Sequence, residues 1–318
     1  ETLDNYDNVT ELKDPEGHIE KYTYNVLGQV LTETPAKGEA FKYTYTYDNA
    51  GNLLTGQDPL ARKTTYEYDN AGNLIKISEA NNAVTNFNYN KLNQRTSTTN
   101  DSQHTFVAEF NRAQRTYQTK GPLNNTSTVT LDAFGQVNTV TDANGNKTAY
   151  QYNKGQLKQT TYPTFSQSYS YNNSQQVEAV VNSFSGQSTR SEFGYDPLGQ
   201  LLKETDPEQK ITVYSYDALG RVTTITDANN GITKLTYDSR DNLLTVTDPE
   251  ARVTRFEYNK NDQVVAEIRT PESGQESRRT YDYDANGNLI EEITPNGQKL
   301  VYGYDVADQL KTIAFYAN

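Results

Sequence analysis

The side chains that could carry out chemistry are few, and they do not converge along the sequence. The chain has no cysteine and only two histidines, His18 and His104, which lie far apart. A zinc site needs three or four Cys, His or carboxylate ligands at short characteristic spacings, and neither histidine has such neighbours. His18 follows Gly17 in a predicted turn, and His104 lies in an irregular stretch. We therefore predict that neither histidine has a catalytic or metal-binding role.

Aspartates are the other candidates for acid–base or metal chemistry. A glycosidase needs two convergent carboxylates, one of them in an apolar pocket that raises its pKa. The aspartates here recur at equivalent turn positions, and building the turn accounts for them. The stretch from Asp142 to Asn146 resembles the start of a calcium loop, but the distal glutamate of an EF-hand is absent. We expect no catalytic residue, no cofactor site, no metal site and no enzymatic activity.

The tyrosines follow the strongest pattern in the chain. The motif Tyr-Asp-x-x-Gly-Asn-Leu at residues 47–53 returns at residues 68–74 and 283–289. Fifteen positions of this kind are separated by fourteen intervals, and ten of the intervals are 21 residues long. Such a period is typical of a repeat architecture, in which each unit buries its apolar face against its neighbours. The anchor tyrosines are Tyr24, Tyr47, Tyr68, Tyr89, Tyr152, Tyr171, Tyr195, Tyr216, Tyr237, Tyr258, Tyr283 and Tyr304, with Leu3, Phe110 and Leu131 at the other positions.

Residues 62–80 show how one repeat is expected to fold. Apolar and polar residues alternate before the anchor, so Tyr66 and Tyr68 lie on one face of a strand. The next four residues, 69–72, combine Asp, which can bond its own backbone, with Gly, which can take a positive φ, and they predict a hairpin turn. A second strand should run from Leu74 to about Ser78, and a second turn then leads to the next repeat. The predicted turn glycines are Gly28, Gly51, Gly72, Gly135, Gly199, Gly220 and Gly287.

The second strand departs from simple alternation. Its apolar residues often lie three positions apart, as at Leu74 and Ile77, whereas a flat strand places them two apart. A β-bulge or sharp twist in each repeat would reconcile this spacing and would also curve the sheet. Residues 91–120 fit the repeat poorly, with Arg95 and Thr116 where Leu or Val is expected. We interpret this stretch as either a local irregularity or a contact site.

The repeat count predicts an all-β fold without helices. About thirty strands at about 4.8 Å each give a sheet roughly 140 Å long, which would be roughly 45 Å across if closed into one turn. Open sheets rarely exceed about ten strands without curling or splitting. We therefore predict an array of about fifteen ~21-residue antiparallel β-hairpins in a long curved sheet that spirals into an open shell. Residues 1–318 should form one continuous array within a larger protein.

The net charge argues against nucleic acid as a partner, and the distribution of apolar residues argues against insertion into a membrane. The formal net charge is -12 at pH 7, whereas binding to nucleic acid needs a basic surface that displaces counterions. No apolar run approaches the length of a membrane span, so we expect no membrane insertion. The absence of cysteine, together with many Asn, Thr and Tyr residues, favours a secreted or cell-surface protein of bacterial origin.

These residues resemble the YD repeats of Rhs proteins, Tc insecticidal toxin complexes, wall-associated bacterial proteins and animal teneurins. The resemblance covers essentially the whole chain and is clearest at residues 47–59, 195–207, 216–227 and 237–249. It implies spiralled hairpins that form a hollow shell, which in the toxins encapsulates a C-terminal effector. It also connects the repeats with carbohydrate binding and, in teneurins, with cell adhesion. The Asp-Pro-x-Gly-Leu autocleavage region of the toxins has no counterpart, because Asp196-Pro197-Leu198-Gly199 is an ordinary first turn.

Two functions follow from this resemblance and from the repeat pattern. In the first, the chain is a structural shell segment that encapsulates a toxin or effector polypeptide, with flanking domains of the same protein as further partners. In the second, it is a cell-surface adhesion or carbohydrate-binding module. The tyrosine ladder most simply packs successive hairpins together through cross-strand pairs, and if exposed it would be a platform for sugars or an unfolded guest chain. In the second function, residues 91–120, with Arg95, Arg112 and Arg115, would be the candidate contact site.

Overall fold

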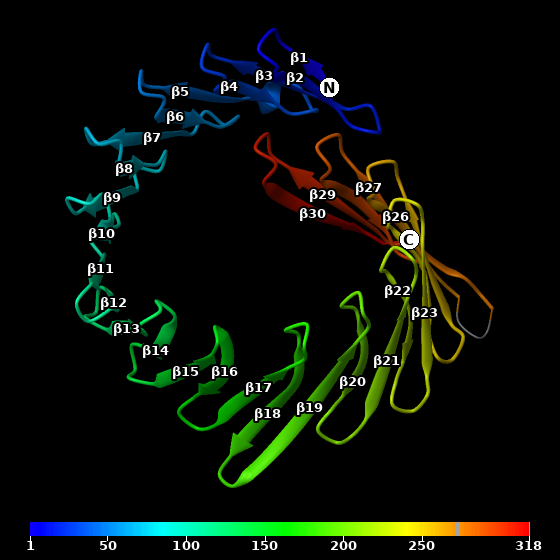
Figure 1. The fold of residues 1–318 in the computed structure, drawn as a ribbon. Helices are drawn as coiled ribbons and strands as arrows, with labels where there is room; N and C mark the ends of the chain where they lie inside the picture. Colours follow the sequence, from blue (N-terminus) through cyan, green and yellow to red (C-terminus); the bar gives the residue numbers. More distant parts are fainter. Residues whose placement is uncertain (271–273, 318) are drawn as a thin grey trace. The chain divides into compact units, whose positions relative to one another are not determined.

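The computed structural model describes residues 1–270 and 274–317, and nearly all of its regular structure is β-strand. Thirty strands belong to one sheet and pair antiparallel with their neighbours along the chain (Figure 1). Among the described residues, the single helical element is the short 3-10 turn η1, Glu39–Phe41. The predicted all-β array of antiparallel hairpins is therefore confirmed.

The sheet divides into two compact units. The first unit comprises Glu1–Asn86 and Leu235–Asn318. Strands β9 and β23 run across its boundaries with the second unit. Its strands are β1 (Thr2–Leu3), β2 (Val9–Lys13), β3 (Ile19–Tyr24), β4 (Val30–Thr34), β5 (Tyr43–Tyr47), β6 (Leu53–Gln57), β7 (Lys63–Tyr68), β8 (Leu74–Ser78), β9 (Val84–Tyr89), β23 (Ile232–Tyr237), β24 (Leu243–Thr247), β25 (Val253–Tyr258), β26 (Val264–Thr270), β27 (Ser277–Tyr283), β28 (Leu289–Ile293), β29 (Lys299–Tyr304) and β30 (Leu310–Tyr316).

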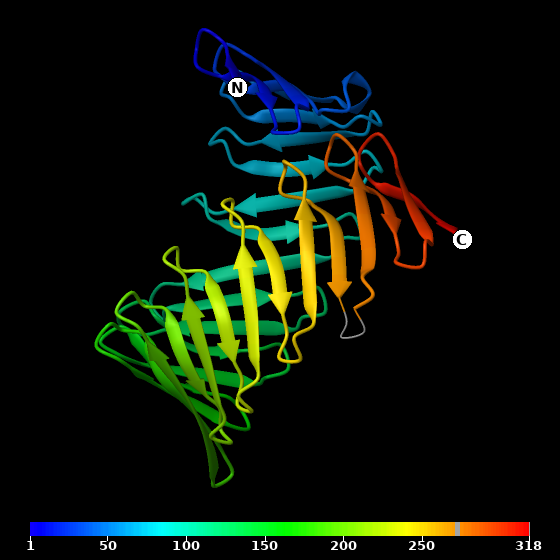
Figure 2. The same ribbon diagram turned by 90° about the vertical axis from the view of Figure 1, so that its right-hand side faces the viewer.

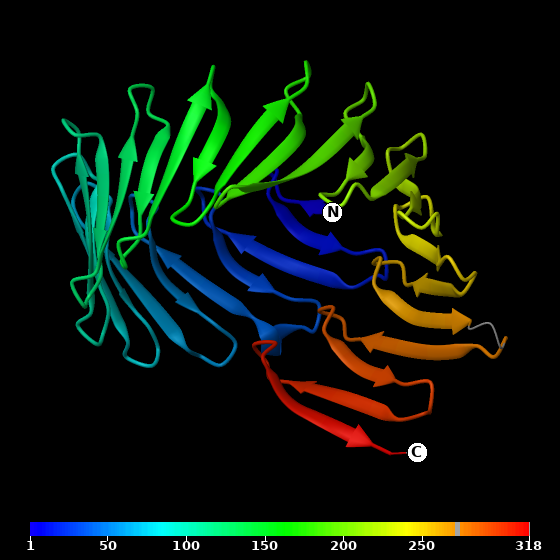
Figure 3. The same cartoon turned by 90° about the horizontal axis from the view of Figure 1, so that it is seen from below.

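The second unit comprises Phe87–Lys234 and continues the same alternation of strands. Figure 3 shows its hairpins following one another along the chain. Its strands are β10 (Arg95–Thr99), β11 (Thr105–Asn111), β12 (Thr116–Lys120), β13 (Thr126–Leu131), β14 (Val137–Thr141), β15 (Lys147–Asn153), β16 (Gln156–Thr161), β17 (Ser166–Tyr171), β18 (Val177–Phe184), β19 (Gln187–Tyr195), β20 (Leu201–Thr205), β21 (Ile211–Tyr216) and β22 (Val222–Thr226).

The hairpin of β7 and β8 shows the local structure of one repeat. Its second strand spans Leu74–Ser78, as the sequence predicts. In the first turn, the backbone N–H of Gly72 donates to the carbonyl of Asp69 at 3.0 Å, and the N–H of Asp69 donates to the carbonyl of Asn73 at 2.9 Å. The turn closes in the left-handed region, with φ of +80° at Gly72, where a side chain would cost about 1–2 kcal/mol.

The predicted β-bulge is present beside the anchor residue. In the β7–β8 pair, Glu67 lies opposite Lys76 but Tyr68 lies opposite Leu74, so Ile75 is the extra residue. This shift places Leu74 and Ile77 on one face, because Ile77 lies opposite Tyr66. The three-residue spacing of apolar residues is therefore explained. Equivalent shifts occur at anchors Leu3, Tyr24, Tyr47, Leu131, Tyr152, Tyr171, Tyr195, Tyr216, Tyr258, Tyr283 and Tyr304.

The irregular repeat lengths arise at the second turns, which join one hairpin to the next. The turn between β4 and β5 is lengthened by η1, and the hairpin of β18 and β19 is extended to a tight turn at Gly186. The turn between β16 and β17 is short and is closed by stacked rings of Tyr162 and Phe165, with centroids 4.4 Å apart. Most first turns keep one form, but the β11–β12 hairpin has no bulge and the β15–β16 turn is shorter, at Lys154 and Gly155.

Burial takes place between neighbouring strands of one layer. In the part of the chain that the structure describes, the buried apolar residues are Ala179, Ala266 and Ile268. Figure 2 shows antiparallel strands lying side by side as single ribbons in each unit. Each hairpin is therefore held by the hairpins before and after it, as expected for a repeat array.

Candidate functional site: the tyrosine face

The two faces of the sheet differ in residue type and exposure. On β21, Thr212, Tyr214 and Tyr216 are half-buried, while the alternate residues Val213 and Ser215 are exposed. We call the face that carries the anchor residues the tyrosine face and the opposite one the threonine face. Tyrosine, valine, leucine and isoleucine side chains dominate the tyrosine face.

The anchor tyrosines link each hairpin to the one before it. The Tyr216 hydroxyl donates a hydrogen bond to the backbone carbonyl of Leu201, at 2.7 Å. Backbone pairing between β20 and β21 ends at Lys203 opposite Val213, so the phenol replaces ladder bonds that the separating strands no longer make. The same bond joins Tyr24 to Val9, Tyr47 to Val30, Tyr171 to Leu157, Tyr195 to Val177, Tyr258 to Leu243, Tyr283 to Val264 and Tyr304 to Leu289.

The first turns carry a second set of links that the sequence reasoning missed. The Gln29 side-chain amide donates to the carbonyl of Gly51 in the next first turn, at 2.7 Å. A Cβ at Gly51 would lie 3.2 Å from Gln29 Nε2, so this turn needs glycine for close approach as well as for its φ of +87°. Glutamine directly after the turn glycine recurs in the sequence and was the available signal. Equivalent bonds run from Gln136 to Gly155, Gln176 to Gly199 and Gln263 to Gly287.

The structure places every predicted turn glycine in the left-handed region. The φ angles run from +75° at Gly28 to +88° at Gly199. Where glycine is absent, other residues take this conformation, such as Ala251 at +63°. The remaining members of the predicted set are Gly51, Gly72, Gly135, Gly220 and Gly287.

The repeated aspartates build turns. Asp48 Oδ1 accepts the backbone N–H groups of Ala50 at 2.9 Å and Asn52 at 2.8 Å. Its second oxygen accepts the Asn52 side-chain amide at 2.9 Å. The hydrogen bond from the Asn52 side chain, followed by that from its backbone, lowers the pKa of Asp48. Asp142 is used in the same way, since its carboxylate accepts two backbone N–H groups and the Asn146 amide.

Carboxylates lie among the tyrosines of the tyrosine face. Glu33 is opposite Tyr22 on β3, and its Oε2 lies 3.4 Å from the Tyr45 hydroxyl. Burial raises the pKa of Tyr45, and Glu33 beside it raises it further, to about 12. The Tyr22 hydroxyl donates to Glu20 at 2.7 Å. These phenols therefore remain neutral hydrogen-bond donors near pH 7.

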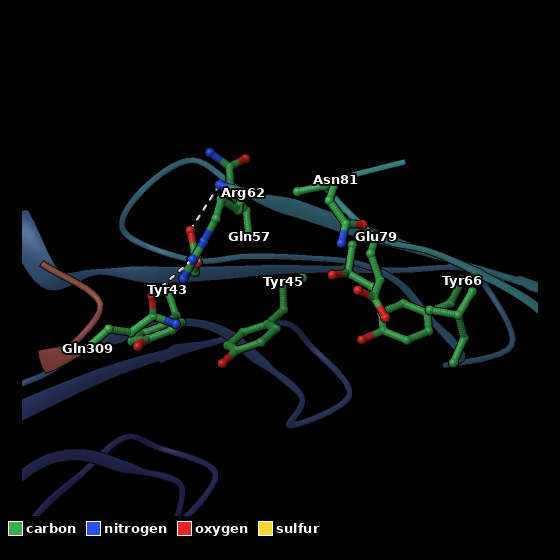
Figure 4. Close-up of a pocket in the computed structure, with 13 residues that line it drawn as sticks. Tyr43, Tyr45, Gln57, Arg62, Tyr66, Glu79, Asn81 and Gln309 are labelled. Atoms are coloured by element: carbon green, nitrogen blue, oxygen red, sulfur yellow. Dashed lines mark hydrogen bonds and ion pairs between the residues drawn. The ribbon is translucent and has the colours of Figure 1, made fainter. Parts of the chain in front are cut away.

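A hollow of about 630 Å³ opens on the tyrosine face of the first unit (Figure 4). Tyr43, Tyr45 and Tyr66 follow one another along it, with Gln309 at the Tyr43 end. Asp58 also lines it, with its Oδ2 2.5 Å from Nε of Arg62. The other lining residues are Gly56, Gln57, Thr64, Ile77, Glu79, Ala80 and Asn81.

The threonine face is built from cross-strand hydroxyl pairs. The hydroxyls of Thr23 and Thr32 lie 2.6 Å apart, as do those of Thr46 and Thr55. Such pairs stabilise a sheet by about 0.2–1 kcal/mol each. The threonine face also exposes apolar side chains, including Ile211, Val213 and Ile232.

Second turns near the N-terminus contact first turns near the C-terminus within the first unit. Lys37 Nζ lies 3.0 Å from Asp284 Oδ2 and 3.1 Å from Asp308 Oδ1. The Asn261 side chain bridges the turn of residues 14–17, accepting from the Glu16 N–H at 3.2 Å and donating to Asp14 at 2.5 Å. Repeats more than 240 residues apart thus share hydrogen bonds and ion pairs.

The histidines lie in turns. His18 Nδ1 is 2.8 Å from Asp14 Oδ2, and the His104 backbone N–H donates to Asn100. Within residues 1–270 and 274–317, no group of three or more His, Cys, Asp or Glu side chains is arranged to hold a metal ion. The described residues also contain no helix long and apolar enough to cross a membrane.

The irregular stretch of residues 91–120 contains a second hollow, of about 670 Å³, in the second unit. Arg95, Phe110 and Tyr117 line it. The Arg95 guanidinium lies 5.6 Å from the centroid of the Phe87 ring. Arg112 and Arg115 lie in the turn between β11 and β12 and do not line this hollow. The structure therefore does not bring the three arginines of the predicted contact site into one cavity.

Comparisons with solved structures find the same fold in Tc toxin complexes. One, titled TcdB2-TccC3 without hypervariable C-terminal region, has a TM-score of 0.67 at 13% identity and covers 97% of this chain and 21% of its own. TcdB2-TccC3-Cdc42 has a TM-score of 0.65 at 14% identity, covering 93% and 19%. The Photorhabdus luminescens Tc holotoxin pore has 0.62 at 13% identity, covering 93% and 21%. The chain therefore spans about a fifth of the length of these relatives.

Comparison with sequence families assigns the chain to a family. No curated protein matches the sequence. The RHS repeat family matches residues 47–84, which contain two copies of the Tyr-Asp-x-x-Gly-Asn-Leu motif. The teneurin YD-shell family matches residues 122–317, more than half of the chain, and the described part of that range has the bulged hairpins, anchor tyrosines and turn glycines set out above. The chain belongs to the teneurin YD-shell family.

Proposed function

We propose that the chain is a wall segment that encapsulates a polypeptide, with its tyrosine face toward the enclosed chain. The family and the solved relatives support a structural shell role. The observation that supports encapsulation of a polypeptide is the tyrosine face. Tyr214 and Tyr216 are half-buried, and β21 packs against its neighbours β20 and β22. Aromatic side chains with polar tips suit weak contacts to an unfolded chain.

The mechanism is physical. A wall excludes proteases and solvent, and many weak contacts hold a guest without fixing one fold. The net charge of -12 favours a basic guest over an acidic one. Secretion, a bacterial source and flanking domains in the same protein belong to this proposal. Carbohydrate binding, which was the alternative, has no observation in its favour among the described residues.

A binding experiment with one face altered at a time tests the proposal. The probe is fluorescein-labelled lysozyme, reduced and carboxamidomethylated so that it stays unfolded and basic, and binding is followed by fluorescence anisotropy. Thr212→Lys places a cation on the tyrosine face, and Ser215→Lys places one three residues along the same strand on the threonine face. We expect the first change to weaken binding and the second to leave it nearly unchanged. Equal effects, or no binding by the unaltered chain, would reject the proposal.

A further inference from the structure

One strand position on the tyrosine face is occupied by glycine in a single hairpin of the first unit. Gly56 on β6 lies opposite Tyr45 on one side and Thr64 on the other. In the next hairpin, the equivalent residue opposite Tyr66 is Ile77. Other hairpins have an aliphatic residue there, such as Val180 or Ile225, or a glutamate, such as Glu33 or Glu292. Gly56 and the half-buried Tyr45 both line the hollow of Figure 4, and glycine leaves the space beside the Tyr45 ring unfilled.

The glycine is not required by the backbone. Its φ lies outside the left-handed region, and a Cβ at residue 56 would lie 3.6 Å from Cδ1 of Tyr45, which is ordinary van der Waals contact. Glycine within a strand costs stability because it loses more conformational freedom on folding and packs no side chain. A residue that weakens the strand and opens a hollow between aromatic rings points to an occupant.

The charges around the hollow favour a cation. Arg62 is paired with Asp58 at 2.5 Å, so together they are close to neutral. Glu79 lines the same hollow, is exposed, and forms no ion pair with any described residue. Figure 4 shows Glu79 extending beside Tyr66, so a carboxylate and aromatic rings border one space. The Glu33 carboxylate next to the Tyr45 hydroxyl adds further negative potential.

We propose that the hollow at Gly56 binds an arginine side chain of the enclosed polypeptide. A planar guanidinium can stack on a tyrosine ring and donate two parallel hydrogen bonds to a carboxylate. Tyr66, beside which Glu79 extends, supplies the ring and Glu79 the carboxylate, while Gly56 and Tyr45 line the rest of the hollow. This inference rests on the proposed function, because the encapsulated polypeptide supplies the arginine.

The test uses small ligands, so that it does not depend on a whole guest protein. Binding of N-acetyl-argininamide to the full 318-residue chain is measured by NMR titration of backbone amides. N-acetyl-citrullinamide has nearly the same shape without the charge and is the matched ligand control. We expect the arginine compound to shift the amide signals of Gly56 and Thr64 and the citrulline compound to bind at least about tenfold more weakly.

Two variants separate the hollow from the rest of the surface. Gly56→Val supplies a β-branched residue like those at this position in other hairpins, and it should abolish binding while keeping or raising the melting temperature. Gly194→Val, in a strand of the second unit, is the matched control and should leave binding unchanged. Glu79→Gln alters an exposed side chain, preserves the fold and should weaken binding at least about fivefold.

Some outcomes would overturn the inference. Undiminished arginine binding by Gly56→Val would do so, as would equal binding of the citrulline compound. Shifts caused by N-acetylglucosamine, with none caused by the arginine compound, would assign the hollow to sugars instead. A failure here, with binding of unfolded lysozyme still sensitive to Thr212→Lys, would reject the arginine site alone. Loss of that sensitivity would reject the proposed function itself.

Discussion

Two junctions between hairpins in the second unit are built differently. Between β20 and β21, three residue pairs form, the strands then separate, and the Tyr216 hydroxyl bonds the carbonyl of Leu201. Between β12 and β13, five pairs form without interruption, and the Leu131 N–H bonds the carbonyl of Arg115. The first junction ends in a tyrosine and the second in a leucine.

The difference follows from the hairpin that precedes each junction. The β19–β20 hairpin has a bulge at Tyr195, which turns β20 away from the next hairpin and frees a backbone carbonyl. The β11–β12 hairpin has no bulge, since Phe110 lies opposite Tyr117 and Asn111 opposite Thr116 in regular register. A straight strand continues its ladder, and the next anchor does not need a hydroxyl. We infer that the bulge and the following anchor tyrosine act as a pair.

The largest effect is expected when the whole Tyr216 ring is removed at the junction between β20 and β21. Tyr216→Ala should destabilise β20–β22 by about 2–3 kcal/mol, because it removes a half-buried aromatic ring and its hydrogen bond. Repeat arrays open locally, so the measurement is hydrogen exchange of the amides in residues 201–226. Protection in β12 and β13 should stay the same. Equal loss in both regions would contradict a local link.

The next effect concerns the turn glycine of the same hairpin. Gly220→Ala should cost about 1–2 kcal/mol, because φ is +83°. In addition, the new Cβ would lie 2.8 Å from Nε2 of Gln200. Ala251→Gly, at φ of +63°, is the reverse change and should stabilise its own turn. Urea unfolding followed by circular dichroism measures both variants. A neutral Gly220→Ala would remove the argument from backbone strain.

Removing the hydroxyl alone isolates the bond between hairpins. Tyr216→Phe should cost about 1 kcal/mol and raise amide exchange near Leu201. Tyr214→Phe is the matched control on the same strand and face, because no hydrogen bond is described for its hydroxyl, and it should have little effect. If the two variants behave alike, the phenol–carbonyl bond does not hold the junction.

Lowering the pH should destabilise the β21–β22 hairpin more than the β11–β12 hairpin. Hydrogen bonds from the backbone and then the side chain of Arg221 outweigh burial and lower the pKa of Asp217 in the β21–β22 turn. Its folded pKa lies below its unfolded value of about 3.9, so its contribution is complete above that value and is lost as pH falls further. Asn111 occupies this position in the β11–β12 turn and does not titrate. In the β21–β22 hairpin, amide protection relative to the intrinsic exchange rate should fall between pH 5 and pH 3, and Asp217→Asn should remove that fall.

The smallest effect is expected from adding a hydroxyl where the ladder is complete. Leu131→Tyr should change stability by less than about 0.5 kcal/mol, because the Arg115 carbonyl already accepts the Leu131 N–H. Thermal unfolding of this variant beside Tyr216→Phe measures the asymmetry. A clear gain from Leu131→Tyr would show that the tyrosine stabilises a junction without a preceding bulge.

The period of the sequence was sufficient to predict the hairpins. Each sequence signal arises from interactions within about twenty residues. These signals are the alternation before Tyr68, the Asp-x-x-Gly turn and the spacing of Leu74 and Ile77. The bulge was predictable because it changes which residues share a face. The link from Gln29 to Gly51 was readable in principle, since glutamine recurs after the turn glycine.

Features that depend on distant repeats were not predictable. Lys37 lies within ion-pair distance of Asp284 and Asp308, more than 240 residues along the chain, and no local pattern of the sequence reports a contact at that separation. The hollow at Gly56 depends on residues of the β5–β6 and β7–β8 hairpins and of the turns that follow them, and on Gln309. Closure of the sheet into a shell and the predicted single array over residues 1–318 stay predictions.

The central claim is that the tyrosine face contacts the enclosed polypeptide, and site-directed photo-crosslinking tests it most directly. The chain has no cysteine, so Thr212→Cys and Ser215→Cys can each be labelled at one site with benzophenone maleimide. These residues lie on opposite faces of β21. With unfolded lysozyme as the probe, we predict crosslinks from residue 212 and few from residue 215. Equal crosslinking from both sites, or crosslinking from residue 215 alone, would contradict the claim.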